Sequence, residues 1–86
     1  MNIDELIVNV KKKLKKNINI ESILIEDKTF LHKNHSGHEN NKFHLKIRIE
    51  SGELKKLNKI EGNKKIYKIL DEELKNYIHS LQISIY

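Results

Sequence analysis

The sequence predicts a small α+β domain, a two-layer α/β sandwich in which two helices cover one face of a three-stranded sheet. Apolar residues recur at helical spacing in residues 2–16 and 64–76. They alternate with polar residues in 42–50 and 78–86, the pattern of strands with one buried face. The chain has 86 residues, which is enough for a single domain over residues 1–86 but not for a second hydrophobic core.

Residues 2–16 are expected to form the first helix. Its apolar stripe consists of Ile3, Leu6, Ile7, Val10 and Leu14. Asn2 is suited to cap the N-terminus, with Glu5 three residues later. Lysines in 11–16 place five positive charges near the C-terminal end, where they oppose the negative end of the helix dipole. We interpret this lysine run as a solvated helix end rather than a binding surface.

Three strands are expected. The first spans residues 20–27, with Ile23 and Ile25 on one face. The second, 42–50, shows the clearest alternation and places His44 on its polar face, so that His44 is not counted among the candidate ligands. The third spans 78–86, and His79 at its entrance shares the parity of the apolar residues Leu81, Ile83 and Ile85.

The second helix is expected over residues 64–76. Its apolar stripe consists of Ile66, Ile69, Leu70 and Leu74. The preceding residues 53–63 are charged and ambiguous, with apolar residues at helical spacing and Gly62 as an interruption. The expected order is therefore helix, strand, strand, helix, strand, and two such helices can cover one face of the sheet.

The absence of cysteine limits the chemistry of this chain. Thiol nucleophiles, disulfides and self-contained iron–sulfur or cysteine-based zinc sites are excluded. The first residues carry acidic charge where a secretory signal has basic residues, and no apolar run is long enough to cross a bilayer. We therefore expect a cytoplasmic protein that does not enter membranes.

The positive charge of the chain has two explanations. A net charge of +5 and a pI of about 9.4 are compatible with a nucleic-acid partner. However, lysine, isoleucine and asparagine, which all have A/T-rich codons, dominate the sequence. Arginine, the preferred residue for bidentate phosphate contacts, occurs only as Arg48. We favour compositional bias over a selected polyanion-binding surface.

Residues 28–44 contain four of the five histidines. Turn-forming residues fill this segment, so it is expected to be a loop, and so long a loop in a small domain is usually functional or disordered. His32, His35 and His38 have the spacing H-x-x-H-x-x-H, and neutral imidazoles so placed can converge on a metal. Histidine is also common in polar loops that bind no metal. Our hypothesis is that the domain holds this loop near His79.

The sequence does not indicate an enzyme. It contains neither a nucleophile elbow nor a glycine-rich phosphate loop. Its acidic pairs are consecutive in sequence, as in Glu26-Asp27 and in 71–73, and do not suggest a pair of cooperating carboxylates.

Several segments together match a known family. They are Ile25-Glu26-Asp27 before the histidine loop, Phe43–Ile49 followed by Ser51, Ile66-Tyr67, and an ungapped run from Tyr67 that ends on Ile78-His79-Ser80-Leu81. On these residues the chain resembles BolA-like proteins over nearly its whole length. The resemblance implies a class II KH-like fold with the order α-β-β-α-β. The phosphate-clamping G-x-x-G of true KH domains is absent in that family, and Gly62 here has no second glycine three residues on.

The resemblance further implies a non-enzymatic adaptor of iron–sulfur cluster assembly or trafficking. In that family a [2Fe–2S] cluster is shared with a monothiol glutaredoxin, which contributes its cysteine and the thiol of glutathione. The BolA side contributes a C-terminal histidine, matched here by His79, and a histidine or cysteine of the loop. His32 is the best match to this loop ligand, with His35 and His38 as alternates.

Two other interpretations remain open. Some BolA-like proteins act as DNA-binding transcriptional regulators, and here Lys46, Arg48, Lys64 and Lys65, together with the lysines of 11–16, would contact phosphates. Alternatively, the chain is a structural domain whose loop is disordered. The sequence does not decide whether the protein forms homodimers.

Overall fold

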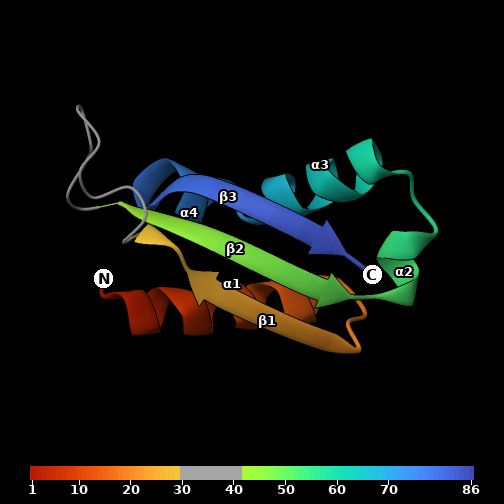
Figure 1. Ribbon diagram of the computed structural model, residues 1–86, viewed down its shortest axis with the longest axis horizontal. Helices are drawn as coiled ribbons and strands as arrows, with labels where there is room; N and C mark the ends of the chain where they lie inside the picture. The colour runs from red at the N-terminus through yellow and green to blue at the C-terminus, as the bar shows by residue number, and fades with distance from the viewer. Residues whose placement is uncertain (30–41) are drawn as a thin grey trace.

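The computed structural model describes residues 1–29 and 42–86 (Figure 1). Its elements are α1 (Ile3–Asn17), β1 (Ser22–Asp27), β2 (Phe43–Glu50), α2 (Gly52–Lys55), α3 (Lys59–Ile69), α4 (Asp71–Asn76) and β3 (Ile78–Ile85). The predicted two-layer α+β sandwich with a three-stranded sheet is confirmed, with the second helical segment divided into three. His32, His35 and His38 lie outside the described residues.

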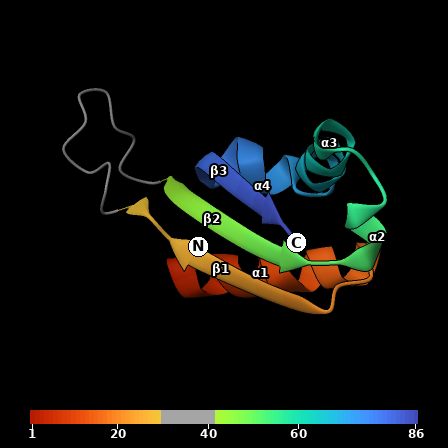
Figure 2. The ribbon, with the colours of Figure 1, turned by 45° about the vertical axis from the view of Figure 1, so that its right-hand side comes forward.

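The sheet has the order β1-β2-β3. Strand β2 pairs antiparallel with β1, where Ile47 lies opposite Ile25, and parallel with β3, where Ile47 lies opposite Ile83. The helices lie on one face of this sheet (Figures 1 and 2). We call the opposite face the outer face. Because β2 and β3 run in the same direction, their first residues lie at the same end of the sheet.

The core lies between the sheet and helices α1 and α3. Its buried apolar residues are Leu6, Val10, Leu14, Ile18, Ile25, Leu45, Ile47, Ile49, Leu54, Ile66, Leu70, Ile78 and Leu81. The stripes of both helices and alternate residues of the strands contribute to this set, as expected for two amphipathic layers. None of the helices in residues 1–29 and 42–86 is both long and apolar enough to span a bilayer.

The start of α1 forms as predicted. The side chain of Asn2 accepts a hydrogen bond of 2.8 Å from the backbone N–H of Glu5. In the lysine run, Lys12, Lys15 and Lys16 are exposed. Lys13 instead forms a partly buried ion pair of 3.0 Å with Glu73 of α4, which ties the first helix to the last.

The predicted bounds of the second helix were wrong. Helix α3 begins at Lys59, where Asn58 and Glu61 form a capping box, and the helical path breaks at Leu70 (φ −96°, ψ 18°) before α4. Gly62, predicted as an interruption, is buried inside α3. A Cβ atom at Gly62 would lie 3.0 Å from Cδ1 of Ile85, so the missing side chain allows α3 to approach β3 closely.

Ser51 connects three segments at the end of β2. It is fully buried, and its Oγ caps α2 by accepting a hydrogen bond of 3.2 Å from the backbone N–H of Leu54. The same hydroxyl donates to the carbonyl oxygen of Asn19 at 2.7 Å. The residue therefore links α2 to the connection between α1 and β1.

We expect Ser51→Ala to lower the free energy of unfolding by about 1–3 kcal/mol, because it leaves the carbonyl of Asn19 and the buried backbone N–H of Leu54 without their partner. Urea denaturation followed by circular dichroism measures this change. Ser22→Ala, on the exposed part of β1, is the control and should change stability by less than about 0.5 kcal/mol. Equal effects of the two substitutions would contradict the role given to Ser51.

Candidate functional site

The candidate site lies where β2 and β3 begin. Phe43 pairs with Ile78, but the next residue of β2, His44, pairs with Ser80. His79 is therefore an extra residue on β3, as in a β-bulge. Bulges redirect side chains, and His79 is the residue redirected here.

The predicted parity of His79 was wrong. Alternation along the strand places it with Leu81 on the apolar face, but His79 is exposed while Ile78 and Leu81 are buried. The bulge is the cause, since one additional residue shifts the alternation of the strand at this point. His79 is thus accessible from outside the domain and does not belong to the core.

His44 lies on the outer face of the sheet, as its alternation predicted, yet it is only 5% exposed. Its Nδ1 lies 2.6 Å from the hydroxyl of Ser80, directly across the strand pair. Its backbone N–H donates to Oγ1 of Thr29 at 3.1 Å. The polar surroundings of His44 therefore hold a buried imidazole in one place.

The rings of His44 and His79 are in contact. Their centroids lie 4.9 Å apart, and their planes are inclined by 55°. The alternation pattern of a single strand excluded His44 and so missed this pair. The signal that could have found it is topological: each histidine is the second residue of its strand, and a helical crossover between neighbouring strands makes them parallel.

Two adjacent imidazoles can contribute ligands to a metal centre but do not complete one. Within residues 1–29 and 42–86, no group of three or more His, Cys, Asp or Glu side chains is placed to hold a metal ion. The chain also lacks cysteine. A metal centre at this end of the sheet therefore needs donors from the loop or from another molecule. The participation of His32, His35 and His38 stays a prediction.

The four basic residues predicted to contact nucleic acid do not share one surface. Lys46 and Arg48 alternate with the buried residues of β2 and so lie on the outer face. Arg48 donates from Nε to the hydroxyl of Tyr86 at 3.0 Å, and its guanidinium lies 5.3 Å from the centre of that ring. Lys64 and Lys65 belong to α3, in the helical layer.

Lys65 is engaged within the domain. Its ammonium donates to the carboxylate of Glu53 in α2 at 2.7 Å. This hydrogen bond, together with one from the backbone N–H of Asn19, lowers the pKa of Glu53 below its ordinary value. Of the two lysines of α3 predicted to bind phosphate, Lys64 is therefore the more exposed one.

We expect His44→Ala to lower the free energy of unfolding by about 1–3 kcal/mol, because it removes a buried ring and its contact with Ser80. The NMR signals of the His79 ring should also shift, since a neighbouring aromatic ring is removed. Gln82→Ala, an exposed residue of β3, is the control. If the His79 signals do not shift and the free energy of unfolding changes no more than in the Gln82→Ala control, the two rings do not interact.

Comparisons with known proteins agree with this architecture. The sequence profile of the family described as BolA-like protein matches residues 14–86. A curated relative from Haemophilus influenzae, named DNA-binding transcriptional regulator BolA, is 30% identical over 77 residues, which cover 90% of this chain and 72% of the relative.

Solved structures show the same fold. The BolA domain of SufE1 from Arabidopsis thaliana has a TM-score of 0.78 at 26% identity, over 91% of this chain and 86% of that one. BolA1 from Arabidopsis thaliana has a TM-score of 0.77 at 24% identity, over the same shares of the two chains. The profile match extends over most of the domain, including β2, β3 and both histidines of the candidate site. This chain therefore belongs to the BolA-like protein family.

Proposed function

We propose that this protein is a non-enzymatic adaptor of iron–sulfur cluster assembly or trafficking, which shares a [2Fe–2S] cluster with a monothiol glutaredoxin. The observation that carries the proposal is the exposed imidazole of His79 packed against the buried ring of His44, in a chain without cysteine. An exposed histidine on a fixed strand can reach a centre at a protein–protein interface, whereas a core histidine cannot.

The donor chemistry of the chain fits such a shared cluster. Clusters of this type take cysteine thiolates or, at one iron, two histidines as ligands. In the proposed complex the partner supplies its cysteine and the glutathione thiol, and this chain supplies His79 and a loop histidine, His32 or else His35 or His38. Bound there, the cluster would supply a one-electron redox centre whose imidazole ligands raise its potential.

The contribution of this chain is to hold and present its imidazoles. The bulge directs the side chain of His79 outward. The ring of His44, which is itself in contact with the hydroxyl of Ser80, limits the orientations of the neighbouring His79 ring. A ligand held by buried neighbours loses less conformational entropy on binding than one on an unsupported chain.

The proposal is tested by co-expression with the monothiol glutaredoxin of the same host, followed by visible absorption and circular dichroism spectra of the purified complex. The unmodified protein should give a coloured heterocomplex, and His79→Ala should change its spectrum or abolish the colour. Gln82→Ala, three residues further along the strand and also exposed, should leave the spectrum unchanged. His32→Ala, compared with His35→Ala and His38→Ala, identifies the loop ligand.

A colourless mixture of well-folded proteins would contradict the shared cluster. A coloured complex whose spectrum is the same with His79→Ala as with the unmodified protein would contradict the ligand assignment. Far-ultraviolet circular dichroism of each variant separates these results from loss of the fold.

A second candidate is a DNA-binding transcriptional regulator. It is supported by the name of the Haemophilus influenzae relative, a DNA-binding transcriptional regulator, and by the net charge of +5. The basic residues that would contact duplex DNA are Lys46 and Arg48 on the outer face and Lys64 and Lys65 on α3, with the exposed lysines of α1. Because they lie on both layers of the domain, phosphate contacts from one bound duplex would involve only part of this set.

For this candidate, duplex binding should weaken linearly in a plot of log K against log salt, with a slope of about 0.9 per neutralised phosphate. Lys46→Glu should lower affinity by several fold if the outer face is used, and Lys64→Glu if α3 is used. Lys75→Glu in α4 is the charge-matched control. Binding that is absent, or insensitive to salt, would exclude the candidate; fluorescence anisotropy measures both.

A further inference from the structure

Thr29 lies at the edge of the candidate site. It follows β1, which ends at Asp27, and in the sequence it is three residues before His32. It is not among the proposed ligands of the cluster. Its hydrogen bonds nevertheless reach the first residues of β2, where the rings of His44 and His79 meet. Thr29 is therefore connected to the site although it contributes no ligand.

The hydroxyl of Thr29 is held in one orientation by Asp27. The Oδ1 atom of this carboxylate accepts hydrogen bonds from the backbone N–H of Thr29, at 2.9 Å, and from its hydroxyl. Because a carboxylate has no hydrogen to donate, the hydroxyl hydrogen of Thr29 must point to Asp27. The charge of the acceptor makes such a hydrogen bond stronger than one between neutral groups. The lone pairs of the threonine oxygen therefore face a donor on another strand.

That donor is the backbone N–H of His44, whose nitrogen lies 3.1 Å from Oγ1 of Thr29. The carbonyl oxygen of His44 accepts a hydrogen bond of 2.7 Å from the backbone N–H of Lys28. Both main-chain groups of His44 are therefore bound by two consecutive residues of the segment that leaves β1. Since His44 is the second residue of β2, these contacts fix the start of this strand.

The main chain of His44 determines where its ring lies. The residue is buried, and its Nδ1 lies 2.6 Å from the hydroxyl of Ser80. The ring of His79 packs against it, with the two centroids 4.9 Å apart. A displacement of the His44 main chain would carry its ring away from one or both of these contacts. The exposed imidazole of His79 is thus connected through His44 to the hydroxyl of Thr29.

The hydrogen bonds of Thr29 are not needed for the core or for the register of the sheet. The pairing of β1 with β2 extends from Ser22 opposite Glu50 to Asp27 opposite Leu45, and Thr29 lies beyond it. Thr29 is also not one of the apolar residues that form the core or pack against it. Loss of its hydroxyl should therefore loosen one end of the sheet and leave the rest of the domain folded.

We infer that Thr29 is a positioning residue of the candidate site. Its hydroxyl, oriented by Asp27, fixes the main chain of His44. The ring of His44 in turn restricts the orientations in which the imidazole of His79 can bind iron. The purpose of this arrangement rests on the proposed shared cluster, but the coupling from Thr29 to His79 is a property of the chain alone. The two can therefore be tested separately.

The coupling is tested in the protein alone, without partner or cluster. Thr29→Val replaces the hydroxyl by a methyl group of similar size. It should shift the NMR signals of the His79 ring and make the amide hydrogen of His44 exchange about two- to tenfold faster, as expected for the loss of one hydrogen bond. Thr29→Ser keeps the hydroxyl and should restore both properties.

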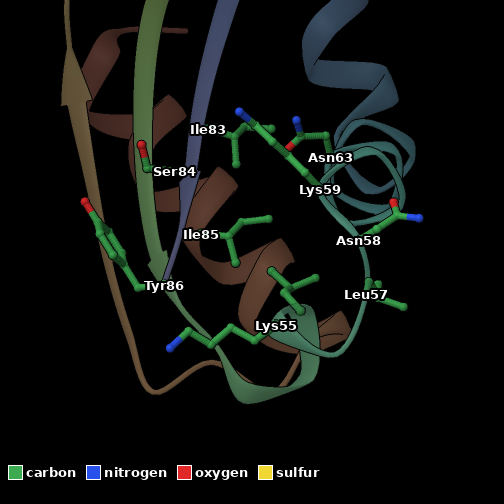
Figure 3. A pocket seen from close by; sticks show the side chains of 10 residues that line it. Lys55, Leu57, Asn58, Lys59, Asn63, Ile83, Ser84, Ile85 and Tyr86 are labelled. Atoms are coloured by element: carbon green, nitrogen blue, oxygen red, sulfur yellow. The ribbon is translucent and has the colours of Figure 1, made fainter.

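Ser84→Ala is the control, because it also removes a hydroxyl from the sheet. Ser84 lies at the opposite end of β3 from His79, beside a groove of about 500 Å³ between this strand and the helical segment α2–α3 (Figure 3). This substitution should change neither the His79 signals nor the exchange of the His44 amide. Far-ultraviolet circular dichroism shows that each variant is folded.

The consequence for the cluster is measured in the coloured complex with the monothiol glutaredoxin. With Thr29→Val, an iron chelator should remove the cluster about tenfold faster than with the unmodified protein, since groups that orient metal ligands have effects of this size. Thr29→Ser should behave like the unmodified protein. If the unmodified protein gives no coloured complex, the proposed function is contradicted, and the NMR comparison still decides whether Thr29 is coupled to His79.

His79 signals that do not shift in folded Thr29→Val would overturn the inference. A cluster that is equally stable with Thr29→Val and with the unmodified protein would overturn it as well. If Thr29→Val does not fold, Asp27→Asn provides the same comparison, because it keeps the shape of the side chain but removes the charge that orients the hydroxyl. It should shift the His79 signals in the same direction.

Discussion

The parallel pairing of β2 with β3 is the feature on which the candidate site depends. It places the first residues of two strands that are far apart in the chain at one end of the sheet, where the rings of His44 and His79 meet. It also places the last residues of β3 beside the helical crossover that makes the pairing possible. An antiparallel β3 would separate the histidines and remove Ile83 and Ile85 from the neighbourhood of α2.

The two ends of β3 have different surroundings. At the first end a bulge turns a histidine outward, and a polar cluster holds its neighbour on the face that carries no described helix. At the other end, α3 approaches β3 closely at Gly62, and a groove lined by Ile83 and Ile85 of β3 and by Lys55 and Lys59 of the helical segment lies nearby. The strand between the two ends is paired with β2 along its length, from Phe43 opposite Ile78 to Ile49 opposite Ile85.

Local patterns in the sequence were sufficient for most of the fold. The alternation in residues 42–50, the helical stripe of residues 3–14 and the capping role of Asn2 appear in the structure as predicted. These features depend on interactions between residues a few positions apart, so a short stretch of sequence is enough to predict them. The predicted bounds of the second helix were wrong because a short window of sequence does not contain the contacts that set them. Only tertiary packing explains a buried glycine inside α3 and a break at Leu70.

The fold class, the family resemblance, the supply of imidazoles and the absence of thiolates all follow from the amino-acid sequence without coordinates. The direction of His79 required the folded chain, because a single extra residue in one strand inverts the alternation and cannot be detected in that strand's own pattern. The burial of His44 beside His79 required it too, as did the engagement of Lys65 with Glu53 and the position of Lys55 and Lys59 at a groove. These outcomes depend on contacts between distant segments, which pairing register and helix packing create.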